Sequence, residues 1–207
     1  MMNKTIKIGK INTSKVELVD IAKAWLAISL AFAFVYSGAS LFSGGINKIF
    51  SMGFLVMFLI SLFTAGIGFL FHELAHKFVA QKYGCVAEFR AFDQMLYLAV
   101  GLAVAVGFIF VAPGAVMIHG QVTRKENGII SAAGPLTNFS LAMIFMGLIF
   151  YLPAWSFIFS PGFFINLWLG LFNLIPFGNF DGIKILHWNR YVWMGMVAFG
   201  VYFLFFL

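Results

Sequence analysis

Charged residues are scarce in this sequence. Only 10% of its 207 residues are Asp, Glu, Lys or Arg, whereas 62% are hydrophobic and 28 are phenylalanine. Soluble domains usually carry about 25% charged residues, so this composition excludes an ordinary soluble fold. The uncharged stretch 51–71 is long enough to cross the hydrocarbon core of a bilayer as a helix. The composition therefore predicts a membrane protein with several spans, and the lipid bilayer is its expected surrounding.

Cysteine and acidic residues are also few. Cys85 is the only cysteine, which excludes an intrachain disulfide and a cysteine-based zinc site. The formal net charge is +6, but the basic residues flank apolar runs. Such charges set the orientation of membrane helices, and we expect no nucleic-acid partner.

Apolar runs of helix length recur along the chain and determine its predicted fold. Ser14 and Glu17 fit a capping box ahead of the first run. The sequence predicts an all-α polytopic membrane protein with five to six transmembrane helices and a small β element between the second and third long helices. The predicted helices are 16–42, a run from 48 or 50 to 83, 129–152, 163–175, a short helix ending at His187, and 191–207.

The intervening segments are short. Residues 1–13 form a polar segment in which Lys and Ile alternate, as in an amphipathic strand. Residues 115–118 and 121–122 are predicted strands, 124–128 a polar turn, and 153–161 an uncharged loop. No repeat or linker is visible, so residues 1–207 are predicted to form a single integral-membrane domain.

The distribution of basic residues predicts the orientation. The lysines before position 16 place the N-terminus in the cytoplasm. The apolar stretch 95–112 either re-enters the membrane on the same side or crosses it as an additional span. Re-entry is preferred because every basic loop residue except Lys48 then lies on the cytoplasmic side.

The sequence His72-Glu73-Leu74-Ala75-His76 lies at the end of the uncharged stretch 51–71. On a helix, His72 and His76 share one face, one turn apart, so both imidazoles can reach one zinc ion. Glu73 lies beside them as a base. The pattern is typical of a metallohydrolase, and its surroundings place it inside a bilayer toward the cytoplasmic side.

A catalytic zinc ion needs a third protein ligand and an open position for water. Asp181 is the strongest candidate because it follows an apolar helix broken at Pro176, and an acid at membrane depth is a functional-site hypothesis by default. The other acids and histidines are mostly expected in loops, where a solvated side chain is the ordinary explanation. These residues are His119, His187, Glu17, Asp20, Glu88, Asp93 and Glu126.

Three segments then occur in a recognisable order. The H-E-x-x-H at 72–76 is followed by Gly134-Pro135 with Asn138, and then by an N-x-x-P-x-x-x-x-D-G run that begins at Asn173. Together they resemble the three motifs of site-2 proteases, the intramembrane zinc metalloproteases of the M50 family. The resemblance covers roughly residues 14–190.

The resemblance implies that His72, His76 and Asp181 bind one zinc ion per chain and that Glu73 is the general base for its water. It implies that Asn173 helps to bind substrate or to stabilise an oxyanion. Asn138 matches the middle motif. For this residue, substrate binding or oxyanion stabilisation and a purely structural role are equally expected.

The expected activity is hydrolysis of peptide bonds in or near transmembrane segments of other membrane proteins. A substrate helix must unwind to expose a carbonyl, and we expect the edge of a strand within 115–122 to pair with the unwound stretch. The alternatives are a catalytically inactive metal-binding membrane scaffold and a metal transporter. A transporter usually has a repeated architecture, which this sequence lacks.

Overall fold

The computed structural model describes residues 5–8, 11–109 and 113–205, and most of them are helical. The chain divides into two compact units. One comprises the residues up to Ile67 together with Phe89–Ala115, and the other comprises Gly68–Glu88 together with Val116–Leu207. The predicted boundaries at 1–13, 95–112 and 191–207 include positions outside the described residues.

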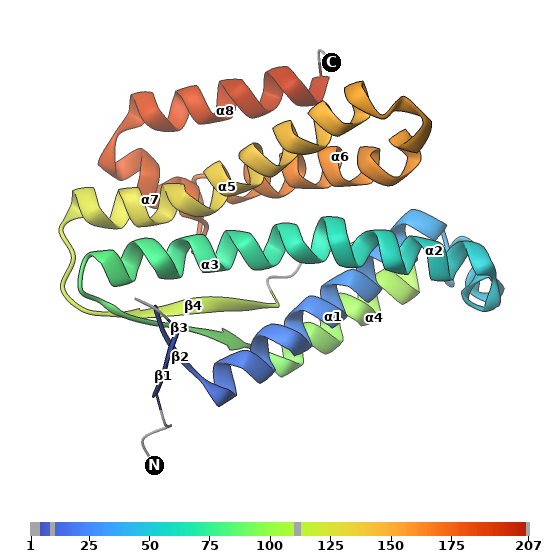
Figure 1. The fold of residues 1–207 in the computed structure, drawn as a ribbon, viewed down its shortest axis with the longest axis horizontal. Coiled ribbons are helices and arrows are strands. Elements are labelled where there is room, and N and C mark those ends of the chain that lie inside the picture. Colours follow the sequence, from blue (N-terminus) through green and yellow to red (C-terminus); the bar gives the residue numbers. More distant parts are fainter. Residues whose placement is uncertain (1–4, 9–10, 110–112, 206–207) are drawn as a thin grey trace. The chain divides into compact units, whose positions relative to one another are not determined.

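In the first unit, α1 packs against both α2 and α4 (Figure 1). An antiparallel hairpin of β1 and β2 precedes α1, so the predicted N-terminal strand is in fact two strands. Ser14 caps α1 as predicted, because its side chain accepts a hydrogen bond from the Glu17 backbone N–H. The elements are β1 (Thr5–Ile8), β2 (Ile11–Ser14), α1 (Lys15–Ser37), η1 (Ile46–Phe50), α2 (Met52–Ser61), η2 (Leu62–Gly66) and α4 (Asp93–Val106).

Glu17 is a buried carboxylate that joins separate parts of the first unit. It is 0% exposed, and its two oxygens accept hydrogen bonds from the Thr13 hydroxyl at 2.7 Å and the Phe89 backbone N–H at 2.8 Å. A buried carboxylate is tolerated only when it is satisfied in this way. Glu17 therefore ties the start of α1 to the strand that contains Phe89.

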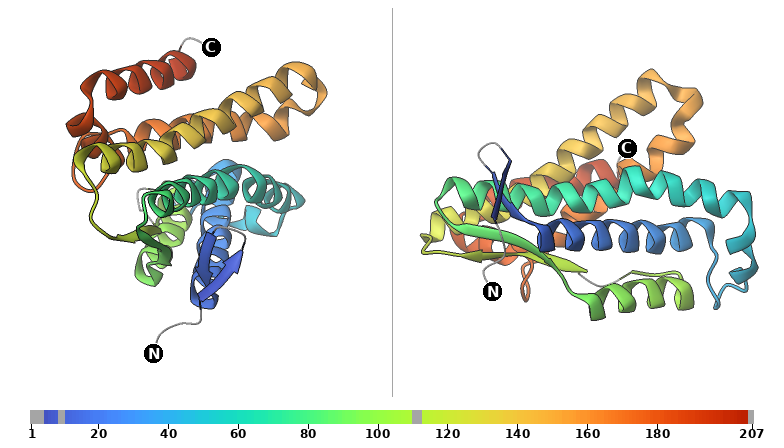
Figure 2. Two further views of the ribbon diagram at one scale, coloured as in Figure 1. Left: turned by 60° about the vertical axis from the view of Figure 1, so that its left-hand side comes forward. Right: turned by 60° about the horizontal axis from the view of Figure 1, so that its bottom comes forward.

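In the second unit, α5 and α6 form a long helical hairpin, and α7 and α8 pack against it (Figure 2). Phe139, Phe163 and Leu167 belong to the apolar core of this hairpin. α3 ends before Gly84, whose φ of 79° is readily adopted only by glycine. The elements are α3 (Ile67–Lys82), α5 (Arg124–Tyr151), η3 (Pro153–Trp155), α6 (Ser156–Asn173), α7 (Asp181–Trp188) and α8 (Arg190–Phe205).

The predicted β element between the long helices is confirmed. β3 (Val86–Ala91) and β4 (Gly114–His119) form a two-stranded sheet, and each strand contributes residues to both units. The predicted strand at 121–122 is wrong, because these residues lead directly into α5.

Two predicted loops are helical instead. Residues 124–128 form the first turn of α5, because Thr123 and Glu126 make a capping box that outweighs the polar composition. The segment 153–161 becomes η3 and the start of α6, with Pro153 at the first helical position. Pro135 lies inside α5, as it does in the predicted helix 129–152.

Within the part of the chain that the structure describes, four helical runs are long and apolar enough to cross a membrane: Lys15–Ser37, Met52–Lys82, Arg124–Tyr151 and Pro153–Asn173. α4 and α8 are apolar but shorter, with 14 and 16 residues. At 1.5 Å per residue, α4 is about 21 Å long, less than the roughly 30 Å hydrocarbon core.

Glu17 provides a test of the first unit. Glu17→Ala leaves the Phe89 N–H without this acceptor, and a buried unsatisfied group costs about 1–3 kcal/mol. We expect the thermal unfolding midpoint in detergent to fall by about 2–4 °C for each kcal/mol. Glu17→Gln is the control, because its carbonyl can accept from Phe89 while its amide donates to Thr13. Equal midpoints for the two variants would contradict this role.

Candidate metal centre

His72, His76 and Asp181 converge on one point in the second unit. They are 4%, 7% and 8% exposed. The two Nε2 atoms lie 3.0 Å apart, and Asp181 Oδ2 lies 3.3 Å from Nε2 of His72 and 3.0 Å from Nε2 of His76. Among the described residues, this is the one group of three His, Cys, Asp or Glu residues close enough to share a metal ion.

The geometry of this triangle fits zinc. Four tetrahedral ligands at about 2.0–2.1 Å from zinc lie about 3.3 Å from one another. The three ligand–ligand distances of 3.0, 3.0 and 3.3 Å match one face of such a tetrahedron. Two imidazoles and one carboxylate are a ligand set that catalytic zinc sites use, with the fourth position open.

α3 supplies both histidines at i and i+4, as the motif predicts. Each ring is held through its other nitrogen. His76 Nδ1 lies 2.8 Å from the backbone carbonyl oxygen of Ile130, and His72 Nδ1 lies 2.6 Å from Oδ1 of Asn138. Such outer hydrogen bonds orient metal-binding histidines and select the tautomer whose Nε2 is free to coordinate.

Asp181 reaches the histidines because the chain breaks after α6 and restarts as α7. It is the first residue of α7, after the N-cap Phe180, so it is not itself the cap. Its Oδ2 faces both Nε2 atoms, so the carboxylate is placed as a candidate anionic ligand. Lys184, one turn later, places its Nζ 3.7 Å from Asp181 Oδ1.

Two glycines allow the close approach that the site requires. A Cβ atom at Gly134 would collide with Nε2 of both His72 and His76, so α5 passes directly against the coordinating side of the imidazoles. A Cβ atom at Gly182 would collide with the Leu174 carbonyl oxygen, which lies at the end of α6. The close packing at Gly134 thus lies at the candidate metal centre itself.

Glu73 lies beside the triangle on α3 and is partly exposed. Its Oε2 accepts a hydrogen bond of 3.1 Å from the backbone N–H of Val116 in β4. The carboxylate is thereby oriented by a strand, and it keeps a second oxygen for other partners.

Asn138 is brought to the centre, whereas no contact places Asn173 there. Asn173 donates to the carbonyl oxygen of Leu169 on its own helix, at 2.9 Å. Sequence reasoning missed Asn166, which is 0% exposed and whose Oδ1 accepts from Asn138 Nδ2 at 3.0 Å. A signal was present, because Asn166 lies in the apolar run 163–172, and a polar residue in such a run seldom lacks a partner.

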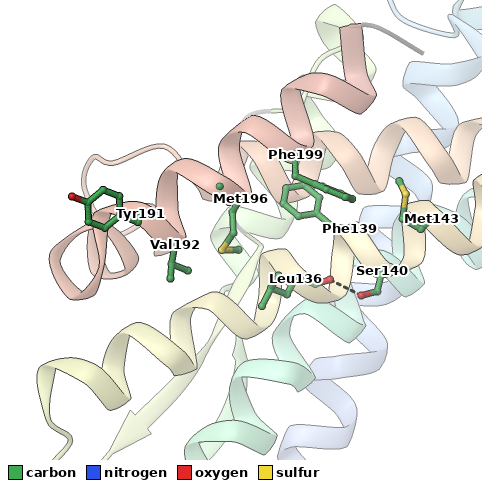
Figure 3. Close-up of a pocket in the computed structure, with 9 residues that line it drawn as sticks. Leu136, Phe139, Ser140, Met143, Tyr191, Val192, Met196 and Phe199 are labelled. Carbon is green, nitrogen blue, oxygen red and sulfur yellow. Dashed lines mark hydrogen bonds between the residues drawn. The ribbon is translucent and has the colours of Figure 1, made fainter.

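Two cavities of the second unit are lined by residues other than the three of the triangle. An apolar groove of about 410 Å³ lies between α5 and α8, lined by residues that include Phe139, Met196 and Phe199 (Figure 3). The Ser140 hydroxyl in this groove donates to the carbonyl oxygen of Leu136. A second cavity of about 410 Å³ is basic and is lined by Arg124, Asn127, Lys184 and His187.

No family model matches the chain, and no solved structure matches it. A protein of Methanocaldococcus jannaschii named "Putative zinc metalloprotease MJ0611" is 39% identical over 200 residues, which cover 93% of this chain and 96% of that protein. A protein of Mycolicibacterium smegmatis named "Putative zinc metalloprotease Rip2" is 32% identical over 133 residues, 56% of this chain and 51% of that protein. Since the first similarity extends over nearly the full length of both proteins, the chain belongs to the same family of zinc metalloproteases as the Methanocaldococcus jannaschii protein.

Proposed function

We propose that this protein is an intramembrane zinc metalloprotease of the site-2 type, which hydrolyses peptide bonds in or near transmembrane segments of other membrane proteins. The observation that carries the proposal is the buried triangle of His72, His76 and Asp181. Its two histidines belong to the run Met52–Lys82, which is long and apolar enough to cross a membrane.

The proposed roles follow from chemistry and position. His72, His76 and Asp181 hold one zinc ion per chain. When bound, zinc acts as a Lewis acid and lowers the pKa of a coordinated water molecule to about 7. Glu73 lies beside the ligands on the same helix and accepts the proton of the attacking water. The bond from Val116 fixes the carboxylate without occupying both of its oxygens.

The depth of the site supports cleavage near the cytoplasmic surface. His76 precedes the end of the run Met52–Lys82 by six residues, or about 9 Å along the axis. Lys82 belongs to the basic residues that we assign to the cytoplasmic side. The site therefore lies within the bilayer, close to that side, and the N-terminus is cytoplasmic.

β4 supplies the proposed docking edge for an unwound substrate. The N–H of Val116 points toward Glu73, and alternate residues of a strand direct their N–H groups to the same side. The N–H of Ile118 therefore shares the edge that faces the base. A substrate that pairs with this edge as an added strand brings its carbonyls next to Glu73.

The two asparagines of the family motifs receive different roles. Asn173 is partly buried at the end of α6, and we assign it to substrate binding or to stabilising the oxyanion. Asn138 is 0% exposed, and its Oδ1 already faces His72, so we assign it to the ligand shell and not to contact with substrate.

The base provides the first test. Glu73→Gln removes the proton acceptor but none of the three ligands. In proteoliposomes containing a membrane-spanning peptide, we expect cleavage to fall by about 10²–10⁴-fold while zinc content stays at one per chain. If the wild type binds zinc but cleaves no faster than this variant across a panel of peptides, the protein is a metal-binding scaffold.

The third ligand provides the second test. Asp181→Asn replaces an anionic ligand by a neutral one, and we expect zinc affinity to fall by more than about 100-fold. Competition with a chelator measures it. Asp93→Asn makes the same chemical change at the first residue of α4, in the other unit, and should leave zinc binding unchanged. Full zinc occupancy in Asp181→Asn would exclude this residue as a ligand.

The strand edge provides the third test. Ile118→Pro removes one N–H from the proposed docking edge and leaves the Val116 N–H that holds Glu73. We expect cleavage to fall at least several-fold with unchanged zinc content, whereas Ile118→Val, which keeps the N–H, should cleave like the wild type. Cleavage at the wild-type rate by a folded Ile118→Pro protein would rule out pairing at this position.

A further inference from the structure

Two buried asparagines form a hydrogen-bonded chain behind His72. We propose that Asn166 is a positioning residue for the metal centre: acting through Asn138, it holds His72 in the tautomer and orientation that present Nε2 to the metal. The inference rests on the proposed function for the identity of the metal, but its evidence is the set of hydrogen bonds among these side chains.

The chain begins at a backbone carbonyl, which fixes its direction. Asn166 Nδ2 lies 2.8 Å from the Gly162 carbonyl oxygen, and a carbonyl oxygen can only accept. The amide nitrogen of Asn166 must therefore face Gly162. Its Oδ1 then faces Asn138, where it accepts a 3.0 Å hydrogen bond from Nδ2.

Asn138 transmits this direction to the histidine. Its Nδ2 donates to two acceptors, the Gly68 carbonyl oxygen at 3.0 Å and Asn166 Oδ1 at 3.0 Å, so both amide hydrogens are used. The remaining atom, Oδ1, lies 2.6 Å from His72 Nδ1. Because Oδ1 can only accept, Nδ1 of His72 must carry the hydrogen, and Nε2 keeps its lone pair for the metal.

Burial makes this direction difficult to reverse. Asn138 and Asn166 are both 0% exposed, so water does not replace a lost partner. A flipped Asn138 amide would point its oxygen at the Gly68 carbonyl oxygen and at Asn166 Oδ1, placing acceptors against acceptors. Without Asn166, only the hydrogen bond to the Gly68 carbonyl oxygen would disfavour the flipped Asn138 amide. Asn166 adds a second hydrogen bond that the flipped amide would lose.

Packing on α3 makes room for the arrangement. A Cβ atom at Gly68 would lie 2.5 Å from Asn166 Oδ1, closer than packed atoms approach, so glycine at this position lets the Asn166 side chain approach α3. Gly68 and His72 are one turn apart on the same helix. The backbone that carries His72 therefore also supplies an acceptor for the amide that orients it.

His76 lies outside this chain and serves as an internal reference. Its Nδ1 is held by the Ile130 backbone carbonyl oxygen, with no asparagine between them. Loss of Asn166 should therefore disturb one histidine of the pair and spare the other. A general loosening of helix packing would disturb both.

The test compares the wild type with Asn166→Leu, which keeps the approximate volume and removes both hydrogen bonds. The protein is labelled with ¹⁵N-histidine, loaded with zinc in detergent micelles, and the exchange of the Nδ1–H protons with water is measured by NMR. Asn138→Leu, which removes the acceptor of His72 alone, assigns the two signals. In the wild type we expect two slowly exchanging Nδ1–H protons.

In Asn166→Leu, the His72 proton should exchange faster while the His76 proton stays unchanged, and the zinc dissociation constant should rise about tenfold. Thr137→Val is the matched control, since it breaks a side-chain bond to the Ala133 carbonyl oxygen next to Asn138 but leaves the chain intact. It should match the wild type.

Unchanged His72 exchange and zinc affinity in Asn166→Leu, or equal changes at both histidines, would overturn the proposal. If Asn166→Leu does not fold, the wild type alone still decides, because a His72 without a protected Nδ1–H contradicts the chain. If the wild type retains no zinc, the proposed protease function fails instead, and the His72 tautomer is then measured on metal-free protein at a pH where the imidazoles are neutral.

Discussion

The arrangement of the second unit depends on burying two imidazoles and one carboxylate within 3.0–3.3 Å of one another. In an apolar interior, such a cluster is stable only with a cation or protons between its members and with partners for its outer atoms. The surrounding helices meet both requirements. α3 supplies two candidate ligands, the break after α6 supplies the third, and α5 supplies the groups that hold the outer nitrogens.

This constraint explains why α5 has its particular sequence near the centre. Gly134 lets the helix pass against the coordinating nitrogens, and Asn138, one turn later, reaches His72. The Ile130 carbonyl oxygen, one turn earlier, reaches His76. Three consecutive turns of one helix face thus perform three tasks: orienting His76, making room, and orienting His72. A substitution at Gly134 or Asn138 is therefore expected to act on the candidate metal centre even though neither residue is a proposed ligand.

Sequence reasoning identified what depends on local spacing or on unusual composition. The i, i+4 placement of the histidines follows from helix geometry, and Asp181 was recognisable as an acid beside a broken apolar helix. The helical turn at 124–128 was missed because its polar composition is typical of a loop. The capping box of Thr123 and Glu126 nevertheless starts the helix there. The Asn166–Asn138 contact was missed for a different reason. It joins α6 to α5, and no periodicity within one helix specifies which residue of another helix it meets.

The proposed protease must bring substrate, water and metal together without loosening the ligands, and the location of Glu73 suggests how. Glu73 adjoins His72 in sequence, but its carboxylate is held by β4 and not by the asparagine chain. His72 is held by the buried side chains of Asn138 and Asn166, and His76 is held by the backbone carbonyl oxygen of the buried residue Ile130. The base is fixed by a strand edge that a substrate can share. In the proposed mechanism, substrate pairing at β4 would adjust the base while the proposed zinc ligands stay in place, because the two sets of hydrogen bonds have no residue in common.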